Sequence, residues 1–250
     1  MLRGELPTRR QLPGSYWRQW SASAVSNLGD GINFAAMPLL ALSITDDERL
    51  LSLTVFATLL PWLLLALPIG VAVDRFDRQV LMVGSNIARL ALFALIAFAV
   101  VGDRLSIWGL LGLLLVIGAC EVTFDSSAQA FLPMIVQPAD LQRANGYLVG
   151  VEVVAGSLLG LSLGAFLFEG GRGVPFVVNA ASFGIAAVLI ASIRVTARPP
   201  QPPRGHDQGG LRVGVRWLLD DQLLRTLAAM LAVTNFGFML GQGIFVKYAA

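Results

Sequence analysis

Five charged side chains stand inside long apolar stretches of the sequence, where a charge is costly to keep. They are Asp30, Arg89, Glu121, Asp125 and Glu152. An ionised group at the centre of a membrane-spanning helix costs about 2.5 to 3.5 kcal/mol even on insertion scales, so such residues usually face a cavity or a partner. A carboxyl group in these surroundings can take up and release a proton. Asp30, Glu121, Asp125 and Arg89 are therefore candidates for proton coupling, and permanent ion pairing with Arg89 is the alternative.

The stretches that hold these residues are long enough to cross a lipid bilayer. The chain is 56% hydrophobic and 14% charged, whereas a soluble domain has roughly 25% charged residues. Runs of about twenty apolar residues span a hydrocarbon core of about 30 Å at 1.5 Å per helical residue. Because the runs are continuous, helices rather than barrel strands are expected. We predict an all-α, polytopic membrane bundle with spans at 20–44, 51–73, 80–101, 107–131, 146–168, 175–193 and 224–246.

Counting residues from the entry of each span gives the depth of each charge. Asp30 and Arg89 both fall near the middle of the membrane and could meet. Glu121 and Asp125 are four residues apart, so they share a helix face and repel each other if both are ionised. One of the two is therefore expected to hold a proton. Glu152 is a weaker candidate, because capping a helix end would also explain it.

The arginines between the spans indicate the orientation of the chain, since loops on the cytoplasmic side carry the excess of Lys and Arg. One set of loops keeps only Arg49, Arg104 and Arg172. The opposite set, together with the N-terminal flank, holds Arg3, Arg9, Arg10, Arg18, Arg75, Arg78, Arg143, Arg194, Arg198, Arg204, Arg212, Arg216 and Arg225. We expect a multi-pass protein of the plasma or inner membrane with a cytoplasmic N-terminus.

Four parts follow from this reading. Residues 1–19 form a cytoplasmic flank, and residues 20–193 form a six-helix bundle. Residues 194–223 form a cytoplasmic linker, in which prolines at 199–203 are followed by a predicted interfacial helix with Leu211, Val215, Leu218 and Leu219 on one face. Residues 224–250 form a seventh span. The chain is expected to be part of a larger arrangement.

The connection between the second and third spans contains the most specific motif. Residues 70–79 read GVAVDRFDRQ, which resembles the signature G-x-x-x-D-R-x-G-R-[RK] of the major facilitator superfamily. The matching positions are Gly70, Asp74, Arg75 and Arg78. Two positions depart from the pattern, because Asp77 replaces a glycine and Gln79 replaces a basic residue. By this resemblance the loop would control the change between conformations.

Two further stretches resemble the drug-efflux branch of that superfamily, which includes macrolide and siderophore exporters. They are residues 26–31 in the first span and residues 121–133 with 141–145 in the fourth span and its loop. In the fifth span Gly156, Gly160 and Gly164 recur at four-residue spacing, which lets helices approach closely. This pattern is similar to the superfamily's antiporter motif, although the proline expected after Gly160 is Leu161.

The resemblance implies a proton-coupled exporter of small amphipathic molecules of macrolide or drug type, which works by alternating access. It also implies that spans one to three and four to six are inverted repeats. The family has twelve spans, so we expect this chain to be the N-terminal portion. A missing C-terminal half or a second chain would then complete transport and supply the helix that Asp74 contacts. An exporter of siderophores or lipid-like metabolites is the alternative within the family.

Other classes fit the sequence less well. A seven-helix receptor or light-driven pump would match the number of spans and Lys247, but such proteins place the N-terminus outside. The sequence has no nucleophile triad, metal cluster or phosphate-binding loop, and His206 lies in the polar linker. We expect no enzyme and no cofactor. A basic stripe with interleaved aromatics is absent, so nucleic acid is not an expected partner. The expected partners are a small-molecule substrate, protons and the lipid bilayer.

Overall fold

The computed structural model describes residues 11–194, 219–227, 229–231 and 233–234. Contacts within the chain divide it into two units, Met1–Pro199 and Pro200–Ala250. In the second unit, residues 222–227 are helical. The predicted interfacial helix lies almost wholly outside the described residues, as do residues 1–10, most of the linker and most of the seventh span. Lys247 and His206 also lie outside them.

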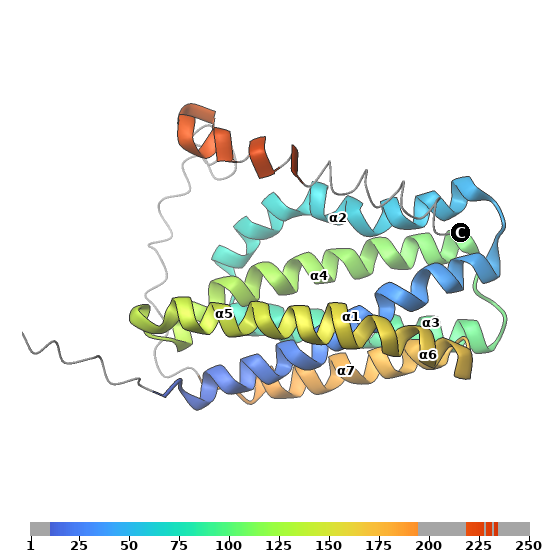
Figure 1. The fold of residues 1–250 in the computed structure, drawn as a ribbon, viewed down its shortest axis with the longest axis horizontal. Coiled ribbons are helices and arrows are strands. Elements are labelled where there is room, and N and C mark those ends of the chain that lie inside the picture. The colour runs from blue at the N-terminus through green and yellow to red at the C-terminus, as the bar shows by residue number, and fades with distance from the viewer. Residues whose placement is uncertain (1–10, 195–218, 228, 232, 235–250) are drawn as a thin grey trace, which may run out of the picture. The chain divides into compact units, whose positions relative to one another are not determined.

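The first unit is a bundle of long helices that run side by side (Figure 1). Its helices are α1 (Gly14–Ile44), α2 (Glu48–Arg75), α3 (Arg78–Val101), α4 (Ile107–Ile135) and α7 (Val174–Ala191), with one further crossing that is divided into segments. That crossing, the divided helix, consists of the turn η1 (Pro138–Asp140), α5 (Leu141–Val151), the π-helix η2 (Glu152–Gly160) and α6 (Leu161–Gly170). The prediction of an all-helical membrane bundle is confirmed.

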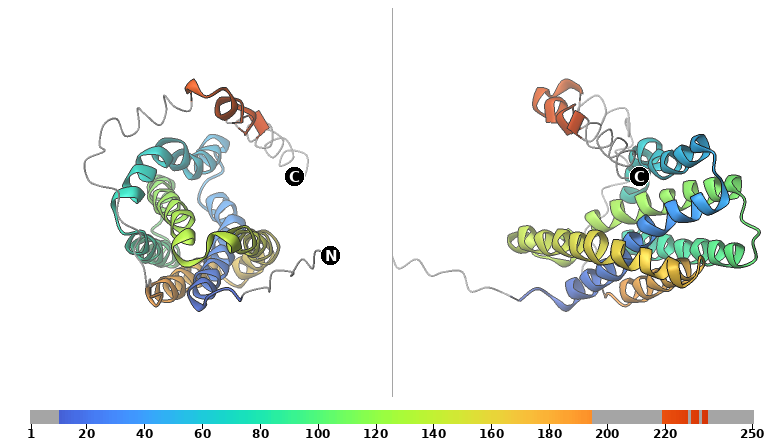
Figure 2. Two further views of the ribbon diagram at one scale, coloured as in Figure 1. Left: turned by 90° about the vertical axis from the view of Figure 1, so that its left-hand side faces the viewer. Right: turned by 45° about the vertical axis from the view of Figure 1, so that its right-hand side comes forward.

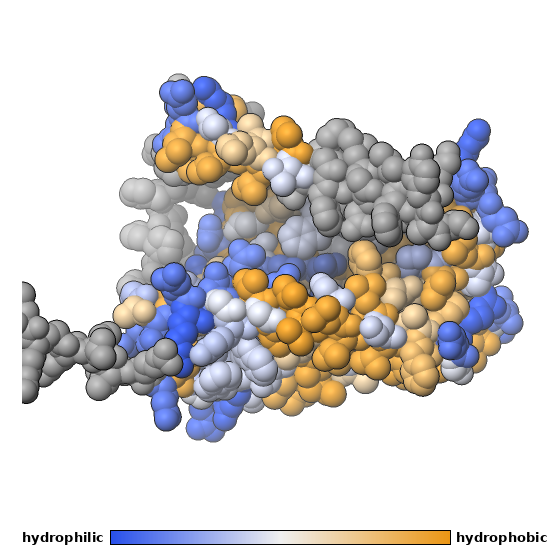
Figure 3. Space-filling view, viewed as in Figure 1, coloured by the Kyte–Doolittle hydropathy of each residue, from blue (hydrophilic) through white to orange (hydrophobic). Residues whose placement is uncertain are grey.

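Within the described residues, five helices are long and apolar enough to cross a membrane: α2, α3, α4, the divided helix and α7. The first helix is not among the five, because its middle carries polar residues such as Ser26, Asn27, Asp30 and Asn33. On the face of the first unit seen in Figure 3, hydrophobic side chains fill the middle and hydrophilic ones gather at the two ends.

Two helices begin at least five residues earlier than the hydropathy pattern predicts. The first begins at Gly14 rather than at residue 20, and the divided helix is α-helical from Leu141 rather than from residue 146. These extra turns are polar, and they pack on each other. The buried Tyr16 hydroxyl donates a hydrogen bond to the Ala144 carbonyl oxygen at 2.9 Å. Hydropathy detects the apolar part of a helix and therefore misses turns that are stabilised by such contacts.

Short polar residues start three of the helices. Asp47 accepts a hydrogen bond from the Arg49 backbone N–H, and Ser106 accepts one from the Gly109 N–H. Asp77 accepts from the N–H groups of Gln79 and Val80 at the start of α3. Each such cap stabilises a helix by about 0.5 to 2 kcal/mol. The caps let the chain reverse direction over very few residues between long apolar helices.

The pairs of helices in contact have an internal symmetry, and Figure 2 shows the bundle from two further sides. The first helix packs on the divided helix, and α2 packs on α4. The first helix also packs on α7, while α3 packs on both α4 and α7. If crossings one, two and three are exchanged with crossings four, five and six, this set of pairs maps onto itself. Equivalent helices are three crossings apart in the chain. Because three is an odd number, they run in opposite directions, as inverted repeats require.

Glycines bring α1 and the divided helix into backbone contact. A Cβ atom added at Gly160 would lie 2.6 Å from the Gly31 Cα atom, which is too close for any real side chain. An added Cβ atom at Gly164 would likewise clash with the backbone of Ile32, and one at Gly31 would clash with the backbone of Gly156. The packing seam formed by Gly31, Gly156, Gly160 and Gly164 therefore fixes the spacing between these two crossings.

This seam predicts how the bundle responds to one added methyl group. Gly160→Ala should destabilise the chain by about 1 to 3 kcal/mol, because the two backbones must move apart. Gly150→Ala is the matched control, since a Cβ atom at Gly150 has nothing within 4 Å. It should be neutral or slightly stabilising, because alanine favours helix more than glycine does. Thermal unfolding in detergent measures both, and equal midpoints for the two variants would contradict the seam.

Candidate functional site

A buried arginine holds the centre of the bundle. Arg89 on α3 is only 1% exposed, and one of its terminal nitrogens lies 3.5 Å from a carboxylate oxygen of Asp30 on α1. The same nitrogen donates to the Ser26 hydroxyl at 3.1 Å. Ser26 and Asp30 are four residues apart, so both point from one face of α1. The structure therefore brings together the two mid-membrane charges that the sequence analysis expected to meet.

Aromatic rings surround the guanidinium of Arg89 on its other sides. Its central carbon lies 3.9 Å from the centre of the Phe183 ring and 5.3 Å from that of Phe124. Phe183 in turn stacks on Phe93, with the ring centres 5.4 Å apart. The negative face of an aromatic ring attracts a cation, and the attraction grows where water is excluded. These rings therefore help to keep a charged arginine in an apolar interior.

The fourth helix adds two carboxyl groups to this region. Glu121 and Asp125 are both half-buried. The carboxyl of Glu121 interacts electrostatically with Asp30, Arg89 and Asp125, and that of Asp125 interacts with Arg89, Asp30 and Glu152. We call Asp30, Glu121, Asp125 and Arg89 the charge cluster. Its three acids outnumber its single base, so the cluster favours the uptake of positive charge.

Glu152 lies at the rim of the charge cluster. It is exposed at the first position of η2 and is within electrostatic range of Asp125. A π-helix is rare and often occurs at functional positions. The sequence analysis did not predict η2, because one extra residue per turn leaves the hydropathy pattern almost unchanged.

Several residues of the site were not identified from the sequence. Ser26 could have been found from its position one turn before Asp30. Phe183 could not, because an aromatic residue in an apolar helix usually packs in the core. Among the described residues, no group of three or more His, Cys, Asp or Glu side chains could hold a metal ion.

The loop between α2 and α3 ties one end of the bundle together. Gly70 lies within α2, Asp74 and Arg75 are exposed in its last turn, and Arg78 is the first residue of α3. Arg78 donates to the Ala130 carbonyl oxygen of α4 at 3.1 Å. Gln79 donates to the carbonyl oxygens of Ile190 and Ile193 at 2.8 Å, where α7 ends.

Both departures from the loop signature have a structural role here. Asp77, where the signature has a glycine, caps α3. Gln79, where the signature has a basic residue, donates to two carbonyl groups at the end of α7, where backbone partners within the helix run out. The loop therefore contacts α4 and α7 at the end of the bundle that also holds Arg18, which donates to the Ser192 carbonyl oxygen.

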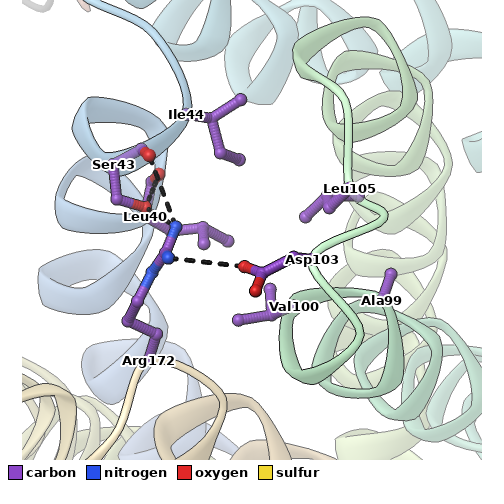
Figure 4. A pocket seen from close by; sticks show the side chains of 8 residues that line it. All are labelled: Leu40, Ser43, Ile44, Ala99, Val100, Asp103, Leu105 and Arg172. Atoms are coloured by element: carbon purple, nitrogen blue, oxygen red, sulfur yellow. Dashed lines mark hydrogen bonds and ion pairs between the residues drawn. The ribbon is translucent and has the colours of Figure 1, made fainter.

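A pocket of about 240 Å³ lies at the opposite end of the bundle (Figure 4). Arg172 reaches across it, with one nitrogen 3.6 Å from a carboxylate oxygen of Asp103 and another donating to the Ser43 hydroxyl at 2.7 Å. The side chains of this ion pair are 46% and 84% exposed. An exposed pair of this kind contributes about 0 to 1 kcal/mol. None of the charge-cluster residues lines this pocket. The bonds of Arg172 join the segment after α6 to the last turn of α1 and to the loop after α3.

Comparison with known proteins adds independent information. Residues 20–249 match the family model of the Major Facilitator Superfamily. The multidrug efflux pump Tap of Mycobacterium tuberculosis (strain ATCC 25618 / H37Rv) is 27% identical over 237 residues, which cover 91% of this chain and 56% of that protein. The pump of the same name from Mycobacterium bovis (strain BCG / Pasteur 1173P2) matches to the same extent.

Macrolide efflux protein A of Streptococcus pyogenes is 22% identical over 182 residues, which cover 72% of this chain and 44% of that protein. The chain thus spans about half the length of the curated relatives that it matches. No solved structure matches the chain.

The charge cluster predicts an asymmetric response to neutralisation. Arg89→Gln should destabilise the chain by about 3 kcal/mol, because it leaves Asp30 without its counter-charge in an apolar interior. Adding Asp30→Asn should recover part of the loss. The matched control is Arg172→Gln, which removes an exposed pair and should cost at most about 1 kcal/mol. Unfolding in detergent measures this double-mutant cycle, and strictly additive losses for Arg89 and Asp30 would disprove their coupling.

Proposed function

Because this chain belongs to the Major Facilitator Superfamily, we propose that it forms the N-terminal half of a proton-coupled exporter of small amphipathic molecules of macrolide or drug type. As a member of that family it is a multi-pass membrane transporter and not an enzyme. The family assignment also removes the seven-helix receptor and the light-driven pump as alternatives. The proposal concerns the coupling ion, the substrate class and the direction of transport.

The charge cluster is the observation that carries the proposal. A carrier driven by protons needs a group that binds a proton in one conformation and releases it in another. Asp30 suits this role because its side chain is 34% exposed while its partner Arg89 is 1% exposed. The Asp30 carboxyl group is accessible to solvent, whereas the Arg89 guanidinium is buried. The efflux function named for the relatives from Mycobacterium and Streptococcus supports the direction of transport.

The geometry supports a simple coupling scheme. When Asp30 takes up a proton, its attraction to Arg89 falls, and the positive charge of Arg89 is left to be balanced by the acids on α4. Glu121 and Asp125 would then carry more of the balance. A cationic or polar substrate that approaches these acids would favour release of the proton from Asp30, because two positive charges compete for the same negative groups. Proton uptake and substrate binding would thus oppose each other, as antiport requires.

Alternating access would need a second bundle of helices. We propose that a C-terminal half or a second chain supplies it and that the exposed Asp74 contacts it at the loop end of the bundle. Arg78 and Gln79 would transmit that contact, since they bond to α4 and α7. The helix that carries Glu121 and Asp125 is thereby joined to the loop through Arg78.

We also propose that the N-terminus lies in the cytoplasm. The support is the arginine excess on one side of the predicted spans. At the end of the bundle that holds the start of α1, the structure places Arg18, Arg78 and Arg143 near the polar ends of helices.

Neutralising Asp30 tests the coupling. Asp30→Asn should abolish macrolide efflux driven by a proton gradient while the protein remains folded, because the amide cannot exchange a proton. Everted membrane vesicles that carry this chain with the proposed second bundle allow drug uptake and collapse of the proton gradient to be followed together. Glu169→Gln is the matched control, since Glu169 is exposed near the end of α6, away from the cluster. It should transport at the wild-type rate.

Wild-type drug transport and wild-type proton movement in Asp30→Asn would refute the role of Asp30. The same vesicles separate substrate classes. Macrolides and cationic dyes should be transported, whereas transport of siderophores alone would favour the exporter of endogenous metabolites.

A reporter fused to the N-terminus tests the orientation. Alkaline phosphatase is active only outside the cytoplasm, and green fluorescent protein fluoresces well only inside it. The N-terminal fusion should therefore fluoresce and lack phosphatase activity. A fusion in the loop at 102–106 should give the reverse result. Phosphatase activity from the N-terminal fusion would invert the proposed topology.

A further inference from the structure

In the described part of the chain, most of the buried polar atoms without partners belong to residues of α1, α3 and α4. Among the described residues, seven buried side-chain nitrogen and oxygen atoms have no hydrogen-bond partner. Two of them belong to Asn33 and Asn179. The other five are Gln19 Oε1, Asn86 Nδ2, Asn86 Oδ1, Arg89 Nε and Ser127 Oγ. These five atoms belong to four residues, each of which is at most 1% exposed.

These four residues follow one line through the bundle. Gln19 donates through Nε2 to the carbonyl oxygen of Ala128, the neighbour of Ser127, so Gln19 and Ser127 lie at the same level. Asn86 stands one turn after Met82 and one turn before Arg89 on α3. Met82 packs in one buried cluster with Ala22 of α1 and Phe124 of α4. Asn86 therefore lies between the level of Gln19 and the level of Arg89.

The first helix presents a matching polar face to this line. Gln19, Ser23, Ser26 and Asp30 recur at steps of three or four residues, which places them on one side of α1. The first three are buried, at 1%, 9% and 1% exposure, and Asp30 is half-buried. Ser26 already contacts Arg89. The line thus begins at Gln19, near the start of α1, and ends at the Arg89–Asp30 pair.

Leaving these groups unpaired would be costly. A buried donor or acceptor without a partner costs about 1 to 3 kcal/mol, and lipid offers no replacement partner. Buried water molecules typically make about three hydrogen bonds each to polar groups of this kind. A cation would suit the oxygens of Gln19, Asn86 and Ser127, but the positive charge of Arg89 opposes it. Neutral water suits donors and acceptors alike.

We propose that a file of internal water molecules runs between α1, α3 and α4, from Gln19 to the Arg89–Asp30 pair. Its length is about 16 Å, from the rise along α1 between these residues. The file gives Asp30 a hydrated connection toward the start of α1. Protons could reach Asp30 along this water. That use of the file rests on the proposed function of Asp30, whereas the presence of the water does not.

Radiolytic hydroxyl-radical labelling of the whole chain in lipid nanodiscs tests the proposal. Radicals formed from bound water oxidise nearby side chains, even when bulk solvent cannot reach them. Met82 is 0% exposed and one turn from Asn86, whereas Met37 is 5% exposed and lies in the apolar cluster around Leu40 and Phe93. Met82 should be oxidised several-fold faster than Met37. Oxidation of Met82 no faster than that of Met37 would overturn the proposal.

Substitutions locate the water. Asn86→Leu removes two of the five unpaired atoms and should lower Met82 oxidation toward the value for Met37. Ser182→Ala is the control, because Ser182 is a buried hydroxyl on α7 that bonds to Asn179. It should leave Met82 oxidation unchanged. Wild-type oxidation of Met82 in Asn86→Leu, with Met37 still protected, would also overturn the proposal. If Asn86→Leu loosens the fold and exposes Met37, the wild-type comparison of the two methionines decides.

The labelling separates this proposal from the proposed function. It is measured without substrate or gradient, so Asp30→Asn should retain rapid oxidation of Met82 even if it transports normally. Loss of proton-driven transport in Asp30→Asn with no labelling of Met82 would support the transporter and reject the water file.

Discussion

The attraction between the Arg89 guanidinium and the Asp30 carboxylate is the constraint on which the rest of the bundle depends. A single charge in the apolar interior would cost several kcal/mol, and a pair is tolerated only when its geometry is good and its remaining groups are satisfied. Ser26 accepts a hydrogen bond from Arg89, and the Phe183 ring faces the cation, whereas the Arg89 Nε atom has no partner among the residues that the structure describes. Three helices, α1, α3 and α7, must therefore hold their spacing and rotation within narrow limits.

The remainder of the bundle maintains that spacing. The glycine seam brings α1 against the divided helix, so α1 can turn its polar face inward without leaving a gap on the opposite side. Each end of the bundle has its own fastening. Arg78 and Gln79 bond to α4 and α7 at one end, and Arg172 bonds to Ser43 and Asp103 at the other. Because these fastenings use exposed or partly exposed polar groups, they can exchange partners with water and permit movement that the apolar core resists.

The sequence predicts the elements well and the site in part. Hydropathy locates the helices because the bilayer dictates their length and their backbone hydrogen bonding. It also identifies Asp30 and Arg89, since charges are conspicuous in apolar runs. The role of Phe183 depends on the rotation of α7 against α3, which no local pattern encodes. The π-helix η2 and the two bonds from Gln79 to the end of α7 are likewise set by contacts between distant segments.

Arg89 and Asp30 differ in exposure, so the two partners of the central ion pair respond differently to their surroundings. Arg89 is closed off by aromatic rings and by three packed helices, so its charge and position change little. Asp30 keeps a third of its side chain exposed, so the carboxylate is the partner that responds to its surroundings. In the proposed coupling scheme, a fixed cation beside a more exposed carboxyl group makes Asp30 the member of the pair whose charge changes. Any movement that changes the water around Asp30 changes both the hydration of its carboxylate and its attraction to Arg89, because the surrounding dielectric constant changes. In the proposed scheme, closure of the bundle and the protonation of Asp30 would therefore depend on each other, and that mutual dependence is what a proton-driven carrier requires of its centre.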